Sequence, residues 1–275
     1  MAVSVIIPCK NEAADTSGLM EDLAKQKAAF QTEIIKITGV SPVSLARNQG
    51  AEKAKGEVLV FIDCDIRLGN EFFLANLVRV LEENEKIGAV CASILIPPGS
   101  SCFQRRYAKE VPHAQSPQVE TITDVSVASS ACCAIEKEKF LEAGGYNESI
   151  IRGEDSVLSF DLIKKGYRVV LAPNTWCYHP QPANIAELIR TNFRNGAGVC
   201  FVDIFHPELN IDVAPQGIEH SSAGRKGFSQ RAGRFTTNIL GAVFKVKLLL
   251  LFSKIAYALG YFYGAAKYGF FKWKE

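Results

Sequence analysis

The sequence predicts an α/β protein: a mixed, mainly parallel sheet flanked by helices, with a helical extension at the C-terminal end. The first observation behind this prediction is an alternation of short apolar runs with longer stretches of helical periodicity. The second is composition, because 275 residues of which 48% are hydrophobic suit one large domain with an appendage. The third is charge: from Arg225 onward the chain has ten Lys or Arg against one acid, so a mildly acidic globule carries a basic tail.

The first part of the chain alternates strands and helices. Each expected strand is an apolar run, and these runs lie at 3–7, 34–37, 58–62 and 88–96. Each expected helix has apolar residues at roughly helical spacing or ends at a glycine, and these helices lie at 17–30, 44–55 and 71–84. Strands and helices in this order indicate βαβ units and a mainly parallel sheet.

The pattern loosens after residue 96. Proline, glycine, serine and mixed charge predict a long loop at 97–121. Small apolar residues then predict a strand at 125–135, and a helix follows at 156–165, where Gly166 is a typical C-cap. The last expected strand, 168–172, stops at a proline.

The chain begins with a strand-like segment and has no basic and apolar leader, so we expect no secretory signal. Its eight cysteines show neither a C-x-x-C pair nor finger-like spacing. Several lie in apolar runs, where a reduced cysteine behaves as a small hydrophobic residue. We therefore expect a cytoplasmic location, without a disulfide framework or a zinc site.

Two carboxylates, Asp63 and Asp65, directly follow the apolar run at 58–62. A run of this kind is typical of a strand buried on both faces, and ligands of open α/β sheets gather at the carboxyl ends of the strands. Two carboxylates at such a place suit a hard divalent cation that carries a phosphorylated ligand. The alternative is a pair of exposed acids at the end of a strand.

Seven short motifs follow one another along the chain: VIIPCKNE at 5–12, ARNQGA at 46–51, GEVLVFIDCD at 56–65, GGYNE at 144–148, GEDSVL at 153–158, LAP at 171–173 and YHP at 178–180. Together they resemble the motifs of family 2 glycosyltransferases with the GT-A fold, which is Rossmann-like. Each motif is weak alone, but their order and spacing are specific. The resemblance covers roughly residues 3–200.

The resemblance implies a GT-A domain at 1–200, with a nucleotide-sugar half at 1–96 and an acceptor half at 97–200. A basic, aromatic-rich helical tail would follow at 201–275. The implied activity is an inverting, metal-dependent transfer from a nucleotide-diphosphate sugar to a hydroxyl acceptor. We expect this acceptor to be a lipid-linked or cell-surface polysaccharide precursor.

By the same resemblance, Asp65 binds Mn²⁺ or Mg²⁺, which acts as a Lewis acid on the pyrophosphate. His179 would be a further metal or phosphate ligand, since imidazole also suits Mn²⁺. Asp63 would lie against the ribose or the donor sugar. The alternative for His179 is a loop histidine beside a proline.

Asp155 corresponds to the general base of the family, which takes the proton of the acceptor hydroxyl as it attacks the anomeric carbon. The alternative is an acid at a helix N-terminus that only stabilises the helix dipole. Its neighbour Glu154 would bind the acceptor or support the loop.

The nucleoside is expected to rest against Pro8, Asn11 and Glu12, at the end of the first strand. Arg47 is placed to reach the base or a phosphate, with a solvated helix arginine as the alternative. One departure from the family concerns the base pocket: no acid stands between Glu33 and residue 52, where relatives usually carry an aspartate that reads the nucleobase. The pocket is therefore shortened or rebuilt.

Arg190 and Arg194 resemble a cationic segment that touches diphosphate or a phosphorylated acceptor in membrane-associated relatives. The alternative is a helix with two solvated arginines.

The tail at 238–273 is rich in aromatic residues but is interrupted by lysines at 245, 247 and 254, so no charge-free run reaches about 20 residues. This pattern favours a helix lying on the cytoplasmic face of an anionic membrane. A core-packed or dimer-forming helix is the alternative, and an oligomer through the tail stays open.

Three other functions compete with the glycosyltransferase. A nucleotidyltransferase of related fold would need a Gly-rich basic loop near the N-terminus, which residues 8–11 do not resemble. A catalytically silent GT-A-like binding protein is disfavoured by the intact acids. Nucleic-acid binding is not expected, because the tail is too apolar and lacks a recognition motif.

Overall fold

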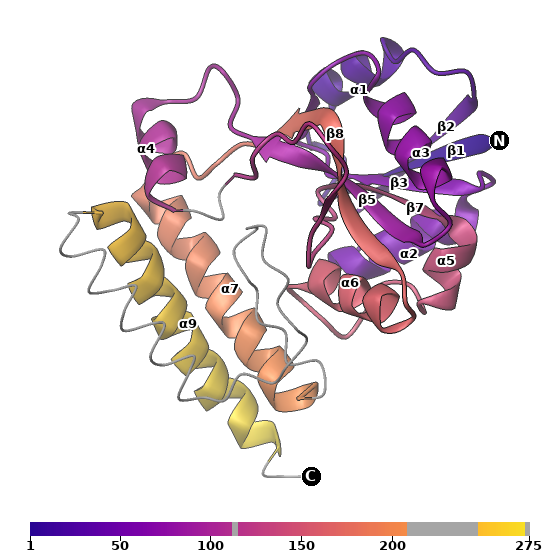
Figure 1. The fold of residues 1–275 in the computed structure, drawn as a ribbon. Coiled ribbons are helices and arrows are strands. Elements are labelled where there is room, and N and C mark those ends of the chain that lie inside the picture. Colours follow the sequence, from indigo (N-terminus) through magenta and orange to yellow (C-terminus); the bar gives the residue numbers. More distant parts are fainter. Residues whose placement is uncertain (112–114, 208–246, 273–275) are drawn as a thin grey trace. The chain divides into compact units, whose positions relative to one another are not determined.

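The computed structural model describes residues 1–111, 115–207 and 247–272 (Figure 1). The described residues belong to two compact units. The first contains residues 1–97 and 115–180, and the second contains residues 98–111, 181–207 and 247–272. Residues 185–200 therefore belong to the same unit as the C-terminal helix. The boundary between domain and tail that we expect at residue 200 stays a prediction.

The first unit is an α/β layer structure. Its strands are β1 (Ala2–Cys9), β2 (Gln31–Thr38), β3 (Val58–Ile62), β4 (Arg67–Leu68), β5 (Ile87–Leu95), β6 (Thr123–Asp124), β7 (Cys132–Glu136) and β8 (Arg168–Tyr178). Its helices are α1 (Ser17–Ala24), α2 (Val43–Lys53), α3 (Phe73–Glu83), α5 (Lys137–Glu142) and α6 (Glu154–Lys164).

The sheet has eight strands in the order β2-β1-β3-β7-β5-β8-β4, and β6 pairs with β8. Strands β2, β1, β3, β5 and β8 run in one direction, whereas β7, β4 and β6 run in the other. The predicted mixed, mainly parallel sheet is confirmed. Because parallel strands end at one edge, the loops after β1, β2 and β3 share that edge.

The core lies on both faces of the sheet, because neighbouring residues of a strand point to opposite faces. In β3, Val60 and Ile62 pack with α1 and α3, whereas Leu59 and Phe61 pack with α2, α5 and α6. Figure 1 shows the two groups of helices on opposite sides of the sheet. Every residue of β3 is buried, which explains its unbroken apolar run.

Two strands differ from the sequence prediction. The strand expected at 125–135 is reduced to β7 because the backbone turns just before it: the N–H of Cys132 donates to the carbonyl of Ser129 over 3.1 Å. The last strand continues past Pro173 to the end of β8, because a register shift in the β5–β8 ladder accommodates the proline.

Two helices also differ. The helix expected at 17–30 ends with α1, because the N–H of Lys27 donates to the carbonyl of Glu71 in the segment before α3. The helix expected at 156–165 begins two residues earlier, directly after Gly153.

The second unit contains α4 (Cys102–Glu110), α7 (Ile185–Phe205) and α9 (Leu248–Lys272) among its described residues. The prediction of a long loop at 97–121 was wrong for residues 102–110, because a capping box starts α4. The Ser101 hydroxyl accepts from the N–H of Gln104, and the Gln104 side chain accepts from the N–H of Ser101. The proline- and glycine-containing segment is only the turn before this helix.

Helices α7 and α9 run side by side in the same direction (Figure 1). A Cβ atom at Gly196 would lie 1.9 Å from the Tyr257 carbonyl oxygen, and one at Gly260 would lie 1.9 Å from that of Phe193. The two backbones are therefore in contact at positions where only glycine fits.

The start of α9 is capped by an acid from α4. Glu110 is buried, and its carboxylate accepts from the N–H groups of Leu249 (2.7 Å) and Leu250 (3.3 Å). Arg106 donates to the same side chain over 2.6 Å. A negative charge satisfies the free N–H groups and the positive dipole of a helix start, so it ties α4 to α9.

The α9 helix exposes large apolar side chains, namely Leu248, Phe252, Ile255, Leu259, Phe262 and Tyr263. Its segment Leu248–Gly269 is long and apolar enough to cross a membrane, with a mean hydropathy of 1.4, despite its lysines. The core helix of a soluble protein can have the same length and composition. A peripheral position stays a prediction, and Lys245 lies outside the described residues.

Candidate active site

The acidic motif follows β3 at the edge where the parallel strands end. The N–H of Asp63 donates to the Ala131 carbonyl oxygen over 2.9 Å, and the N–H of Ile66 donates to the Asp63 carbonyl oxygen over 3.2 Å. The backbone therefore turns within the motif. The Asp63 side chain is 29% exposed and that of Asp65 is 52% exposed, so Asp65 is the more open of the two to a ligand.

His179 follows β8 and approaches the acidic motif. Its Nε2 lies 3.9 Å from Asp65 Oδ1, and its Nδ1 lies 2.9 Å from the Pro180 carbonyl oxygen. Because a carbonyl oxygen only accepts, a neutral ring in this contact carries its proton on Nδ1 and keeps a lone pair on Nε2. His179 thus presents an acceptor nitrogen toward Asp65, as a metal ligand does.

The protein supplies only part of the coordination shell that Mn²⁺ or Mg²⁺ needs. Within residues 1–111, 115–207 and 247–272, no cluster of three or more His, Cys, Asp or Glu side chains is placed to hold a metal ion. Asp65 and His179 would hold it, with the other positions left for phosphate oxygens and water. Cations of nucleotide-dependent enzymes are commonly held by one or two protein ligands together with phosphates, so the residues present fit such an ion.

Arg47 on α2 is the buried centre of the site. It is 2% exposed, and its Nη2 and Nη1 donate to Asp63 and Glu154, each over 2.7 Å. Its guanidinium lies over the ring of Tyr146, 5.3 Å from the centroid. This burial excludes the alternative of a solvated helix arginine, whereas the expected contact of Arg47 with base or phosphate stays a prediction.

Sequence reasoning missed the role of Asn48. Its amide nitrogen donates to the Tyr146 carbonyl and to the Glu148 carboxylate, each over 2.8 Å, and its oxygen accepts from the Tyr146 N–H over 3.0 Å. Asn48 therefore fixes the loop at 144–148 to α2. The sequence offered one signal for this role, namely two adjacent polar residues, Arg and Asn, on a helix that packs on the sheet. Polar side chains that such packing buries need hydrogen-bond partners in neighbouring segments.

Asp155 lies in the first turn of α6 and is partly buried. Its carboxylate accepts from the N–H of Ser156 over 2.8 Å. Burial, together with the negative charge of Glu154, raises the pKa of Asp155 to about 6, although Arg47 opposes the shift. A carboxyl group that titrates just below neutral pH has the property of a general base.

Glu154, the neighbour of Asp155, is only 8% exposed and pairs with Arg47. One carboxylate oxygen of Glu154 is therefore already occupied, and the expected contact between Glu154 and an acceptor stays a prediction. Supporting the loop, the other role expected for Glu154, agrees with its position.

The residues expected to bind the nucleoside differ in their solvent exposure. Pro8 is buried in β1, opposite Ile37 of β2, whereas Asn11 and Glu12 are exposed in the loop that follows β1. The hydroxyl of Thr38 donates to the Glu12 carboxylate. Glu12 therefore supplies a carboxylate at the end of β2, where the family's usual acid is missing.

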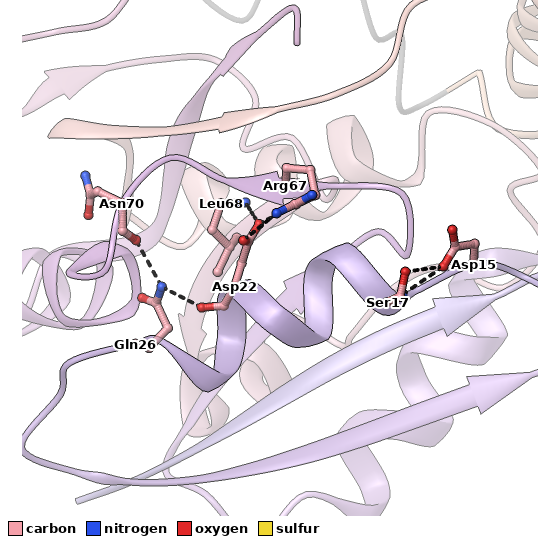
Figure 2. A network of polar contacts seen from close by, with 7 residues as sticks. All are labelled: Asp15, Ser17, Asp22, Gln26, Arg67, Leu68 and Asn70. Atoms are coloured by element: carbon pink, nitrogen blue, oxygen red, sulfur yellow. Dashed lines mark hydrogen bonds and ion pairs between the residues drawn. The ribbon is translucent and has the colours of Figure 1, made fainter. Parts of the chain in front are cut away.

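A polar network anchors the segment that follows the acidic motif (Figure 2). Arg67 donates twice to the Asp22 carboxylate of α1, over 2.7 and 2.8 Å, and the N–H of Leu68 donates to it over 2.9 Å. Burial acts to raise the pKa of Asp22, but these hydrogen bonds outweigh it and hold that pKa below its ordinary value. Gln26 adds a bond to the Asn70 carbonyl over 2.9 Å, so β4 and its flanks are fixed to α1.

Arg190 and Arg194 lie on α7, in the second unit, and both side chains are exposed. They are four residues apart and thus share one face of the helix. Their expected contact with phosphate stays a prediction.

The fold and the site define a class: an α/β enzyme with acidic groups at the carboxyl edge of its sheet, as in GT-A glycosyltransferases. The family model for glycosyltransferase-like family 2 matches residues 1–198. The chain therefore belongs to glycosyltransferase family 2, and the expected enzyme class, a glycosyltransferase, is confirmed.

Two comparisons place the chain among known proteins. The O-antigen biosynthesis protein RfbC of Myxococcus xanthus is 26% identical over 168 residues, which are 55% of this chain but only 13% of that protein. A mannosyltransferase from Pyrobaculum calidifontis, solved with GDP-Man and Mn²⁺, superposes with a TM-score of 0.59 at 17% identity, over 95% of this chain and 86% of its own. At this identity the second comparison supports the fold alone.

Proposed function

We propose that this glycosyltransferase is an inverting, metal-dependent enzyme that moves a sugar from a nucleotide-diphosphate sugar to a hydroxyl acceptor. The observation that carries the proposal is a single connected site. Asp63 at the end of β3 is joined through the buried Arg47 to Glu154, the neighbour of Asp155. A donor-side carboxylate and a candidate base are therefore held in one arrangement.

The residues take distinct roles in this proposal. Asn11 and Glu12 bind the nucleoside, and Asp63 binds the ribose or the donor sugar. Asp65 and His179 would hold Mn²⁺ or Mg²⁺, which supplies Lewis-acid neutralisation of the pyrophosphate charge as the nucleotide leaves.

Asp155 takes the proton of the acceptor hydroxyl as its oxygen attacks the anomeric carbon. The attack comes from the side opposite to the nucleoside diphosphate, so the configuration of the sugar inverts. The raised pKa of Asp155 supports this role, because the group is still deprotonated at neutral pH yet basic enough to accept a proton.

The acceptor class is proposed from chemistry and from the relatives. The first relative is an O-antigen biosynthesis protein, although this chain spans only a small part of it. We therefore propose a lipid-linked or cell-surface polysaccharide precursor. The nucleotidyltransferase alternative loses its support, since the matched family is one of glycosyltransferases.

A donor screen tests the proposed reaction. The purified protein is incubated with UDP-, GDP-, CDP- and dTDP-linked sugars, with polyprenyl-linked or free saccharide acceptors and Mn²⁺ or Mg²⁺, and nucleoside diphosphate release is measured. We expect release from one donor class only when the metal is present, with an inverted anomeric configuration in the product. A folded protein that binds nucleoside diphosphate but turns over no donor would instead support the catalytically silent alternative.

We also propose that the enzyme lies at the cytoplasmic face of an anionic membrane, with α9 as the contact. The exposed apolar side chains of α9 and the basic composition of the tail support this proposal. Whether the helix lies on the surface or crosses it is an outcome of the test below.

Flotation with phosphatidylglycerol-containing liposomes tests the membrane contact. We expect the full-length protein to float, and we expect Leu259→Ser with Phe262→Ser to reduce the floating fraction, because two apolar side chains no longer enter the lipid. Leu141→Ser is the control, since Leu141 is 61% exposed on α5 in the first unit. Retention after a high-salt wash indicates insertion and release indicates a surface contact, whereas a wild-type protein that stays at the bottom would contradict the proposal.

A further inference from the structure

We propose that Arg47 and Glu154 are positioning residues that bind no substrate: Arg47 fixes the base helix α6 to the acidic motif, and Glu154 places a buried carboxylate beside Asp155. This inference rests on the proposed function. It assigns to two residues, expected to contact substrates, a different role within the same site.

The geometry of Arg47 carries the first half of the inference. One guanidinium nitrogen holds Asp63 after β3 and another holds Glu154 at the start of α6, and these residues are far apart in the sequence. A planar guanidinium spans two carboxylates at fixed angles, whereas a lysine ammonium is a single point charge on a flexible chain. Only arginine therefore fixes both groups at once.

Burial and packing restrict the Arg47 side chain to this position. Its side chain is 3% exposed, and the ring of Tyr146 lies against its guanidinium. Tyr146 is itself held by Asn48 on α2, one residue after Arg47. Moving Arg47 to meet a phosphate would leave two carboxylates without their partner, which is costly in a buried site.

The position of Glu154 carries the second half: it precedes Asp155 in the first turn of α6, is only 8% exposed, and accepts a hydrogen bond from Arg47 over 2.7 Å. The charges around Asp155 agree with this position. Burial comes first in raising its pKa, and the negative charge of Glu154 comes second. Arg47 and the N–H of Ser156 lower the pKa, whereas Asp63 raises it slightly. From the neighbouring strands β5 and β7, Asp155 is also close enough to interact with the thiols of Cys91 and Cys133, which stay neutral because burial raises their own pKa values.

The charge of Glu154 can be removed with little change of shape. A glutamine at 154 still offers an oxygen to Arg47 and keeps the bridge to α6. The sign of the effect follows from electrostatics: without the adjacent negative charge, Asp155 holds its proton less tightly.

The test compares Glu154→Gln, Arg47→Lys and the control Arg79→Lys, which changes an exposed arginine paired with Glu83 on α3. For Glu154→Gln we expect the acid limb of kcat/KM to move to lower pH, with KM for the donor unchanged. For Arg47→Lys we expect kcat to fall by about 100-fold because the base is displaced from the donor, again with little change in donor KM. Arg79→Lys should match the wild type.

A titration of the Asp155 carboxyl group by ¹³C NMR, assigned with Asp155→Asn, gives a readout that needs no activity. A lower pKa of Asp155 in Glu154→Gln supports the inference even if no donor is turned over, so its failure and that of the proposed function are distinguishable. An unchanged pKa would overturn the role of Glu154. A large rise in KM for donor or acceptor with unchanged kcat, in either variant, would show direct substrate binding and overturn the inference.

Discussion

Replacing Asp155 by asparagine is expected to lower the rate of sugar transfer by about 10²–10⁴-fold, the usual contribution of a general base. The amide keeps the size of the side chain but cannot take the proton of the acceptor hydroxyl. The hydrogen bond from the Ser156 N–H is made to an oxygen that asparagine also has. The helix start should therefore stay intact, and nucleotide binding should be unchanged.

The measurement is kcat at saturating donor and acceptor, together with the affinity for the nucleoside diphosphate by calorimetry. Asp161→Asn is the matched control, since Asp161 lies on the same helix and is not part of the site. In the wild type, activity should fall as the pH drops below about 6, because Asp155 becomes protonated there. Asp155→Asn with the full transfer rate would exclude this residue as the base.

The fold was predictable because its signals are local. The unbroken apolar run of β3 reflects burial on both faces, and the two acids after it mark the end of the strand. The alternation of strands and helices was enough to predict a mainly parallel sheet. The antiparallel direction of β7 could not be predicted from it. An antiparallel strand between β3 and β5 depends on pairing across long sequence distances, and periodicity within one segment carries no such information.

The centre of the site was not predictable, because its contacts join distant segments. Arg47 has the appearance of a solvated helix arginine until α2 is packed on the sheet, where Gly50 permits a close approach: a Cβ there would lie 2.3 Å from Ile6 Cγ2. Packing then buries Arg47 beside Asp63 and Glu154. In the same way, the hydroxyl of Thr38 brings Glu12 to the end of β2.

Replacing Asp65 by asparagine is expected to remove most of the metal dependence and to lower kcat by roughly 10²–10³-fold, the loss typical when one stabilising group for a developing charge is removed. Asp65 is the more exposed acid of the motif, and it bears no hydrogen bond to Arg47 that would keep it from a ligand. A neutral amide is a weaker ligand for a hard divalent cation than a carboxylate is. Asp65→Asn should still fold, because the Asp22–Arg67 pair holds the following strand in place.

Electron paramagnetic resonance measures Mn²⁺ binding in the presence of nucleoside diphosphate. This measurement distinguishes a variant that no longer binds the ion from one that binds it but has lost catalytic activity. Glu85→Gln, an exposed acid in the turn before β5, is the control and should bind Mn²⁺ as the wild type does. His179→Ala should weaken Mn²⁺ binding as well, because Nε2 of His179 lies 3.9 Å from Asp65 Oδ1, the other proposed ligand. If both Asp65→Asn and His179→Ala bind Mn²⁺ normally, the ion is held elsewhere, and the motif after β3 then serves the sugar alone, through Asp63 and its bond to Arg47.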